Sequence, residues 1–147
     1  MSDAHDALSQ LQHRGLAKFD SMIAPERIAE AHALVRDLAA EHGVFVGGSW
    51  ASSEDSFSVP KPFRKALNRL SRSVEFPHLL DEHVQAVIKD LLGEPVEPLP
   101  PGQQMLFTLP GQSNWAVPHG VWHLDMPRLG NPTSPGLQAF ALLQDIE

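Results

Sequence analysis

Cysteine is absent from the 147 residues of the chain, which excludes disulfide bonds and thiolate metal sites. No apolar run approaches the roughly 20 residues that a membrane-spanning helix requires. The first residues, Met1 to Asp6, are polar and acidic and lack the apolar core of a secretion signal. A formal net charge of -7 disfavours non-specific binding of nucleic acid. We therefore expect a cytoplasmic protein with neither membrane nor nucleic acid as a partner, and the oligomeric state stays open.

Hydrophobic residues make up 42% of the chain and charged residues 20%, a composition typical of globular proteins. The length suits one domain with a modest core. Prolines and glycines are scarce before Gly43 but crowd between Gly93 and Gly136, and both residue types interrupt helices. The sequence therefore predicts a single domain over 1–147 of the α+β class, helical in 1–93 and strand-rich in 94–147.

Three helices are predicted from apolar residues at three- and four-residue spacing. The clearest runs from Pro25 to His42, because proline suits the first helical position and Gly43 suits the end. A second is predicted from Pro77 to Leu92 and a shorter one from Asp3 to Arg14, each followed by a glycine.

Smaller elements are predicted between these helices. Val44 to Val46 indicate a brief strand that runs into a flexible turn at Gly47-Gly48. Ser49 to Pro62 are rich in serine, aspartate and proline and predict a surface loop. Phe63 to Leu70 then indicate one or two helical turns.

Strands are predicted in the second half of the chain. Gln103 to Leu109 alternate, with the odd-numbered residues from Met105 to Leu109 on one face. Val121 to Asp125 form the next extended piece. Gly136 to Ile146 are apolar with polar ends, which is typical of a strand covered on both sides.

The most informative residues are His123 and Asp125 in the stretch Trp122-His123-Leu124-Asp125. On an extended chain, side chains two residues apart point to the same side, so an imidazole and a carboxylate could hold one cation. They would be two of the three protein ligands in the two-His-one-carboxylate site for non-haem Fe(II). The alternative is a structural histidine hydrogen-bonded to a nearby aspartate. His119 is a weaker candidate for a third ligand, because neighbouring proline and glycine argue against a helix there.

Two other polar features have plainer interpretations. A local cluster of positively charged residues consists of Lys61, Arg64 and Lys65. This cluster is either a solvated face or a contact for a carboxylate or phosphate on a substrate. His78 and His83 lie at the start and in the body of a predicted helix and are interpreted as surface or capping residues.

A resemblance to the phytanoyl-CoA dioxygenase family rests on five stretches. The N-terminal part, Leu16 to Asp20 followed by Pro25 to His42, looks like that family's first strand and helix. Gln104 to Gly111 resemble the strand before its iron motif, Trp122 to Asp125 match its Trp-His-x-Asp motif, and Gly136 to Ile146 match the strand after it. The resemblance is specific from about Met105 onward.

The resemblance implies helices packed on a double-stranded β-helix, a cupin-like jelly roll. It also implies a dioxygenase in which His123 and Asp125 bind Fe(II), 2-oxoglutarate chelates the same ion, and a small molecule or acyl derivative is hydroxylated. Met105 and Phe140 stand where the family lines the 2-oxoglutarate pocket. Related halogenases have a small residue at the position of Asp125, so the carboxylate here favours hydroxylation.

One departure from the family governs the interpretation: all eight histidines lie at or before His123. The family's distal histidine ligand and the arginine that pairs with 2-oxoglutarate both follow the strand ending near Ile146. We therefore expect an incomplete jelly roll, the N-terminal part of a longer enzyme, which is inactive or nearly so by itself. The alternatives are a non-catalytic jelly-roll binding or scaffold module, and a metal-dependent cupin enzyme that does not use 2-oxoglutarate.

Overall fold

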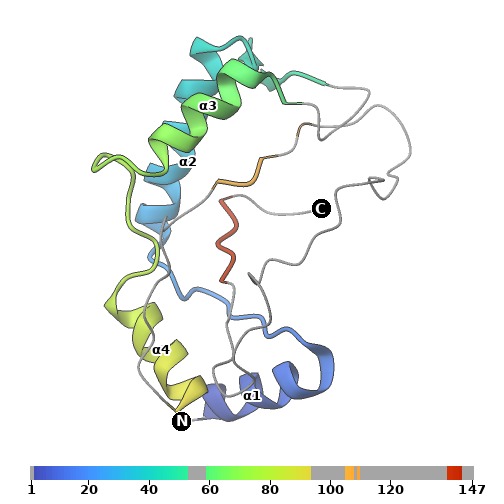
Figure 1. Cartoon of the computed structure of the whole chain (residues 1–147), viewed down its shortest axis with the longest axis vertical. Coiled ribbons are helices and arrows are strands. Elements are labelled where there is room, and N and C mark those ends of the chain that lie inside the picture. The colour runs from blue at the N-terminus through green and yellow to red at the C-terminus, as the bar shows by residue number, and fades with distance from the viewer. Residues whose placement is uncertain (1, 53–58, 94–104, 108, 110–138, 144–147) are drawn as a thin grey trace, which may run out of the picture.

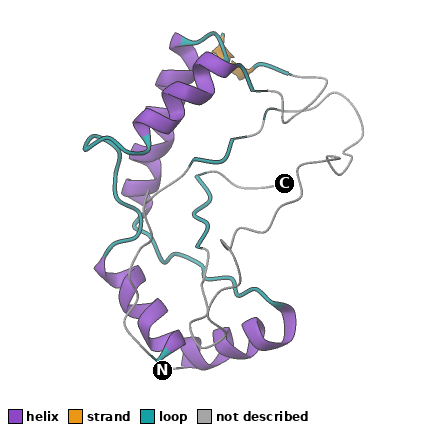
Figure 2. Ribbon diagram, viewed as in Figure 1, coloured by secondary structure: helices purple, strands orange, loops and turns teal. Residues whose placement is uncertain are grey.

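A computed structural model of the chain describes residues 2–52, 59–93, 105–107, 109 and 139–143 (Figure 1). These residues contain four helices and one two-stranded antiparallel sheet (Figure 2). The elements, in chain order, are α1 (Ser2–Arg14), α2 (Pro25–Glu41), β1 (Phe45–Val46), β2 (Ser49–Trp50), α3 (Lys61–Leu70) and α4 (Glu82–Leu92). Within the described ranges, no helix is both long and apolar enough to cross a bilayer.

The helix α2 confirms the prediction from Pro25 onward and ends one residue earlier than expected, at Glu41. Proline occupies the start of the helix and Glu26 stands in its first turn, where a negative charge interacts favourably with the helix dipole. Its buried residues, Ala31, Val35 and Ala39, recur at four-residue spacing and therefore form one face. The helix α1 also confirms its prediction, beginning one residue earlier than expected.

The two strands form a tight hairpin in which Phe45 pairs with Trp50 and Val46 with Ser49. Gly47 and Gly48 make the turn with φ of 62° and 84°, and this left-handed backbone at both central positions is favourable only for residues such as glycine. The predicted strand at Val44–Val46 is thus confirmed with a later start. The predicted loop from Ser49 onward is wrong at its first two residues, because they pair with β1.

Two further helix boundaries differ from the predictions. The helix α3 begins at Lys61 and is longer than the one or two turns expected. The helix α4 begins at Glu82 rather than at Pro77, because the carboxylate of Asp81 accepts a hydrogen bond from the Val84 N–H at 3.0 Å and thereby caps the helix. The end of α4 is confirmed at Leu92, where Gly93 adopts φ 74°.

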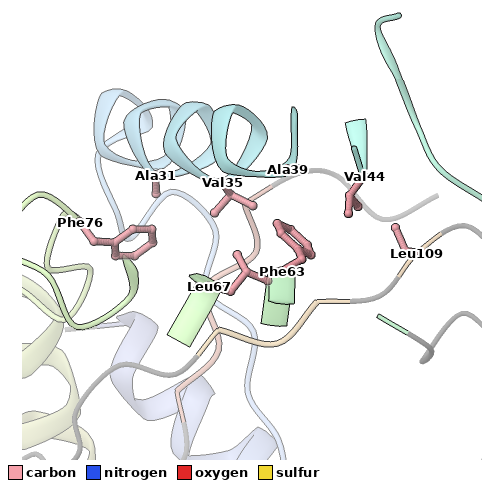
Figure 3. Close-up of a cluster of buried hydrophobic side chains, with 8 residues drawn as sticks. All are labelled: Ala31, Val35, Ala39, Val44, Phe63, Leu67, Phe76 and Leu109. Carbon is pink, nitrogen blue, oxygen red and sulfur yellow. The ribbon is translucent and has the colours of Figure 1, made fainter. Parts of the chain in front are cut away.

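The main hydrophobic core lies between α2, α3 and the hairpin (Figure 3). Phe63 and Leu67 of α3 are 0% and 2% exposed, and they meet the small residues of the buried face of α2. Small side chains on one helix allow the large side chains of the other to approach closely. The buried cluster consists of Ala31, Val35, Ala39, Val44, Phe63, Leu67, Phe76 and Leu109.

The helices form two packing groups. In one group α2 contacts both α3 and β1, and β1 pairs with β2; the other group contains α1 and α4. Figure 1 shows these groups at opposite ends of the view, with the two short segments from the second half of the chain between them. No helix of one group packs directly on a helix of the other within the described ranges.

The described residues show no jelly roll, since their only sheet is the hairpin. Of the predicted strand Gln103–Leu109, residues 105–107 and 109 are described and lie in no strand. Of the predicted strand Gly136–Ile146, residues 139–143 are described and also lie in no strand. The predicted piece Val121–Asp125 lies outside the described residues. The β-helix remains a prediction from the resemblance.

Candidate functional site

The predicted metal pair, His123 and Asp125, lies outside the described residues, together with Trp122 and His119. The structure does place residues that precede and follow this stretch, 105–107 and 109 on one side and 139–143 on the other. The structure therefore describes how these two flanking segments attach to the helices.

The preceding segment attaches through the face that the sequence predicted. Met105 and Phe107 are half-buried against the main core and Leu109 is 5% exposed within it, whereas Leu106 is 75% exposed. This alternation is what an extended backbone produces. The prediction that the odd-numbered residues share one face is confirmed for these four positions.

Phe107 is the aromatic anchor of the segment. Its ring lies 5.1 Å from the ring of Phe63 at an interplanar angle of 86°, and 5.3 Å from the ring of Trp50 at 62°. Edge-to-face pairs at these separations are favourable because a positive ring edge meets a negative ring face. Trp50 in turn packs on Phe45, 4.9 Å away. One ring from the second half of the chain is thus held between α3 and the hairpin.

The following segment attaches at one residue. Leu143 packs against the main core, whereas Phe140 is 69% exposed and Leu142 is 58% exposed. The expectation of a strand covered on both sides is not met over residues 139–143. The two residues predicted to line a 2-oxoglutarate pocket therefore differ in environment: Met105 lies against the core, and Phe140 is largely exposed.

A surface hollow lies where α1 meets the segment that follows it, and it contains neither Met105 nor Phe140. It is lined by Asp6, Ala7, Gln10, Lys18, Phe19 and Asp20. Both carboxylates already have partners: Asp6 accepts a hydrogen bond from Gln10 at 2.9 Å, and Asp20 pairs with Lys18 at 2.9 Å. The hydrogen bond to Asp20 raises the pKa of Lys18. These pairings leave the hollow without a free charged group.

An ion pair connects the two packing groups. Arg27, in the first turn of α2, donates to the Asp81 carboxylate at 2.6 Å and also to the carbonyl oxygen of His78. The other oxygen of the same carboxylate caps α4. The sequence alone does not reveal this arrangement, since the partners are 54 residues apart. Only the capping interaction has a local signal in the sequence: an aspartate stands three residues before Val84, in the position of a helix N-cap.

The hydrogen bond from the Val84 N–H lowers the pKa of Asp81 below its ordinary value of 3.8. The positive charge of Arg27 lowers this pKa further, and partial removal from water opposes both effects. Asp81 is therefore ionised at neutral pH, as its capping and ion-pairing roles require.

The other polar residues singled out from the sequence are at the surface. His78 and His83 are exposed, which confirms their interpretation as surface residues. Lys61, Arg64 and Lys65 are also exposed, on the outer side of α3, as expected for a solvated face. Within the described ranges, no three histidine, aspartate or glutamate residues gather closely enough to hold a metal.

Comparison with known proteins adds no assignment: no family model matches the chain, and neither the curated proteins nor the solved structures contain a match.

Proposed function

We propose that this chain is part of a cytoplasmic, Fe(II)- and 2-oxoglutarate-dependent dioxygenase of the phytanoyl-CoA dioxygenase type, which hydroxylates a small molecule or acyl derivative. The observation that carries the proposal is the Trp122-His123-Leu124-Asp125 sequence between two apolar segments. His123 and Asp125 are the proposed metal ligands. Met105 and Phe140 are the proposed contacts of 2-oxoglutarate.

The donor types of the pair suit the ion. One neutral imidazole nitrogen and one carboxylate oxygen are two of the three protein donors in a two-His-one-carboxylate site, which leaves open positions for other ligands. Asp125 also brings a negative charge that partly offsets the charge of the cation. A bound Fe(II) with 2-oxoglutarate and dioxygen would supply the oxidising chemistry, whereas the protein orients the reactants and excludes water.

The attachment of the flanking segments supports this proposal. Leu109 before the motif and Leu143 after it both contact the main core formed by α2 and α3. Phe107 adds two ring contacts on the preceding side. Metal ligands hold their geometry when packed parts of the fold support them. The segments before and after the proposed ligands both attach to the main core.

The third protein ligand is the part of the proposal that these 147 residues leave open. Every histidine of the chain stands at or before His123, so a distal histidine has to come from another polypeptide segment. We propose that these 147 residues alone bind Fe(II) weakly and turn over little substrate. An arginine for the far carboxylate of 2-oxoglutarate would come from the same distal segment, because its planar fork binds carboxylates through two hydrogen bonds.

The proposal is tested by the thermal stability of the natural full-length protein. A ligand that binds only the folded state raises the melting temperature. Because 2-oxoglutarate would bind through the metal, it should raise the melting temperature when Mn(II) is present as a redox-inactive substitute for Fe(II), and not when the metal is chelated.

The matched variants are Asp125→Ala and His13→Ala. Asp125→Ala should abolish the metal-dependent shift with little loss of stability in the metal-free protein. His13, exposed in the last turn of α1, should be dispensable. A shift by 2-oxoglutarate without metal, or no shift at all, would reject the dioxygenase. Metal binding without any effect of 2-oxoglutarate would favour the cupin alternative, and binding of neither would favour the non-catalytic module.

A further inference from the structure

The ion pair between Arg27 and Asp81 lies where the two packing groups meet. Arg27 belongs to α2, in the group with α3 and the hairpin, whereas Asp81 caps the start of α4. Within the described ranges no helix of one group packs on a helix of the other, so this pair links them directly. The joined nitrogen and oxygen are 2.6 Å apart, and the two side chains are only 32% and 29% exposed.

Arg27 holds a side chain and a stretch of backbone at the same time. One guanidinium nitrogen donates to the Asp81 carboxylate, and the other donates to the carbonyl oxygen of His78. The second oxygen of the same carboxylate accepts the hydrogen bond from the Val84 N–H that caps α4. Hydrogen bonds between charged groups are stronger than those between neutral groups. The start of α4 is therefore fixed to α2 through a single arginine.

The connector from α3 to α4 is attached to the main core only on the near side of this link. Phe76 is 6% exposed within the main buried cluster, and Leu79 packs against that cluster. Beyond Asp81, the buried residues of α4 are Val84 and Leu91, and neither belongs to the cluster. Along this connector, contact with the main core therefore stops at the point that Arg27 holds.

The helices α1 and α4 form a unit of their own beyond the link. They contact each other, and their buried residues are Ala7, Val84 and Leu91, all outside the main cluster. Leu16, at the start of the connector from α1 to α2, is 62% exposed. A region with few buried apolar contacts opens at a lower free energy than the core of the same protein.

We propose that the Arg27–Asp81 pair is a latch, and that α1 and α4 open from the main core as one unit when this pair breaks, while α2, α3 and the hairpin stay folded. Leu109 and Leu143, which attach the segments on either side of the proposed metal ligands, contact the main core. The opening therefore leaves these two attachments in place. This inference is independent of the proposed dioxygenase activity.

The test is hydrogen exchange of the natural full-length protein in low concentrations of urea, followed by mass spectrometry. In the wild type, amides of α1 and α4 should exchange through one shared opening, with a lower free energy and a weaker urea dependence than amides of α2 and α3. The urea dependence is weaker because the opening exposes less surface than global unfolding. Arg27→Gln should raise the exchange rates in α1 and α4 at least tenfold.

Four further variants make the test specific to the latch. Arg27→Lys keeps the charge but loses the two-pronged donor, so its increase should be intermediate. Asp81→Asn keeps a good capping residue but loses the charge, and it should act like Arg27→Gln. Combining Arg27→Gln with Asp81→Asn should add no more than about twofold, because the two residues act through one contact. Arg36→Gln, at an exposed position of the same helix, should leave the rates unchanged.

A core variant separates the opening from global unfolding. Val35→Ala weakens the main core, so it should raise exchange in α2 and α3 while leaving the rates in α1 and α4 within about twofold of the wild type. Three results would overturn the proposal: exchange of all four helices through one global unfolding, wild-type rates in α1 and α4 of Arg27→Gln, or equal acceleration of all four helices in Val35→Ala.

Discussion

The two packing groups of helices differ in what fills the space between their elements. In the group of α2, α3 and the hairpin, Phe63 is 0% exposed and Leu67 is 2% exposed, and ring contacts connect Phe63, Phe107, Trp50 and Phe45. In the group of α1 and α4, the buried residues are Ala7, Val84 and Leu91, at 3% to 7% exposure.

This difference indicates which group supports the candidate site. Large buried side chains remove more apolar surface from water and stabilise the fold more. Both segments that flank the proposed metal ligands attach to the first group, through Leu109 and Leu143. We infer that the first group is the stable support of the molecule, and that α1 and α4 form a weaker unit joined to it in part by Arg27 and Asp81.

The largest effect is expected from Phe63→Ala, which opens a cavity at the centre of the main core. The free energy of unfolding should fall by about 3–5 kcal/mol, the range observed when a buried phenylalanine is truncated. Urea denaturation followed by circular dichroism measures this loss. Leu106→Ala, at a position that is 75% exposed, should change the same quantity by less than about 0.5 kcal/mol. Equal losses in the two variants would contradict the placement of the core.

A smaller loss is expected from Phe107→Ala, because it removes two edge-to-face contacts from a half-buried ring. At about 0.5–1.5 kcal/mol for each contact, the expected loss is about 1–3 kcal/mol. Emission from Trp50 should shift to longer wavelength as its ring becomes more hydrated.

The fluorescence measurement requires a background in which Trp50 is the only tryptophan, made by Trp115→Phe and Trp122→Phe. Phe107→Leu is the conservative control, which keeps apolar contact but loses the ring geometry. It should recover part of the stability and part of the emission shift. An unchanged emission in Phe107→Ala would show that the Phe107 ring does not dock between α3 and the hairpin.

The same substitution in the two groups compares them directly. Val35→Ala in α2 and Val84→Ala in α4 each remove two methyl groups, at positions that are 3% and 6% exposed. The transfer free energy lost is about 1.6 kcal/mol in both cases. Val35 stands in the larger buried cluster, where a cavity is less able to collapse, so its loss should be greater by about 1 kcal/mol. Equal losses would remove the distinction between the groups.

The smallest effect expected is the pH dependence from Asp81. Its pKa in the folded state is lowered, chiefly by the Val84 hydrogen bond, so the unfolded chain binds the proton more tightly. The stabilisation is therefore complete above the unfolded pKa of about 3.9 and is lost as the pH falls through the folded pKa. Between about pH 5 and pH 2, the wild type should lose stability more steeply than Asp81→Asn, measured by urea titration at each pH. Parallel profiles would show that the capping carboxylate is not linked to folding.

Helix boundaries could be predicted from the sequence where a residue at the boundary itself sets them. The helix α2 was predicted to within one residue because Pro25 and the glycine at position 43 stand at its two ends. The start of α4 was predicted at Pro77, four residues before the Asp81 that caps the helix in the structure. The apolar spacing alone does not mark this start, because it is set by the hydrogen bond from the Val84 N–H to the Asp81 carboxylate.

Contacts between distant residues could not be predicted in the same way. Ser49 and Trp50 stand in a stretch with the composition of a loop, and their strand exists because it pairs with Phe45 and Val46. Alternation placed Phe107 on a buried face, but its position between Phe63 and Trp50 depends on three separate elements. For the candidate site, the sequence predicts His123 and Asp125 as ligands, and the structure shows how the flanking segments attach to the core.

The most direct test of the central claim is the affinity of the natural full-length protein for Mn(II), measured by electron paramagnetic resonance in the wild type, His123→Ala, Asp125→Ala and the control His13→Ala. If His123 and Asp125 hold one ion, the wild type and His13→Ala should bind one equivalent with the same affinity. Each of the other two variants should lose at least tenfold in affinity while melting at an unchanged temperature. Binding that survives both substitutions, or variants that lose stability but keep their affinity for Mn(II), would contradict the metal site and with it the proposed dioxygenase.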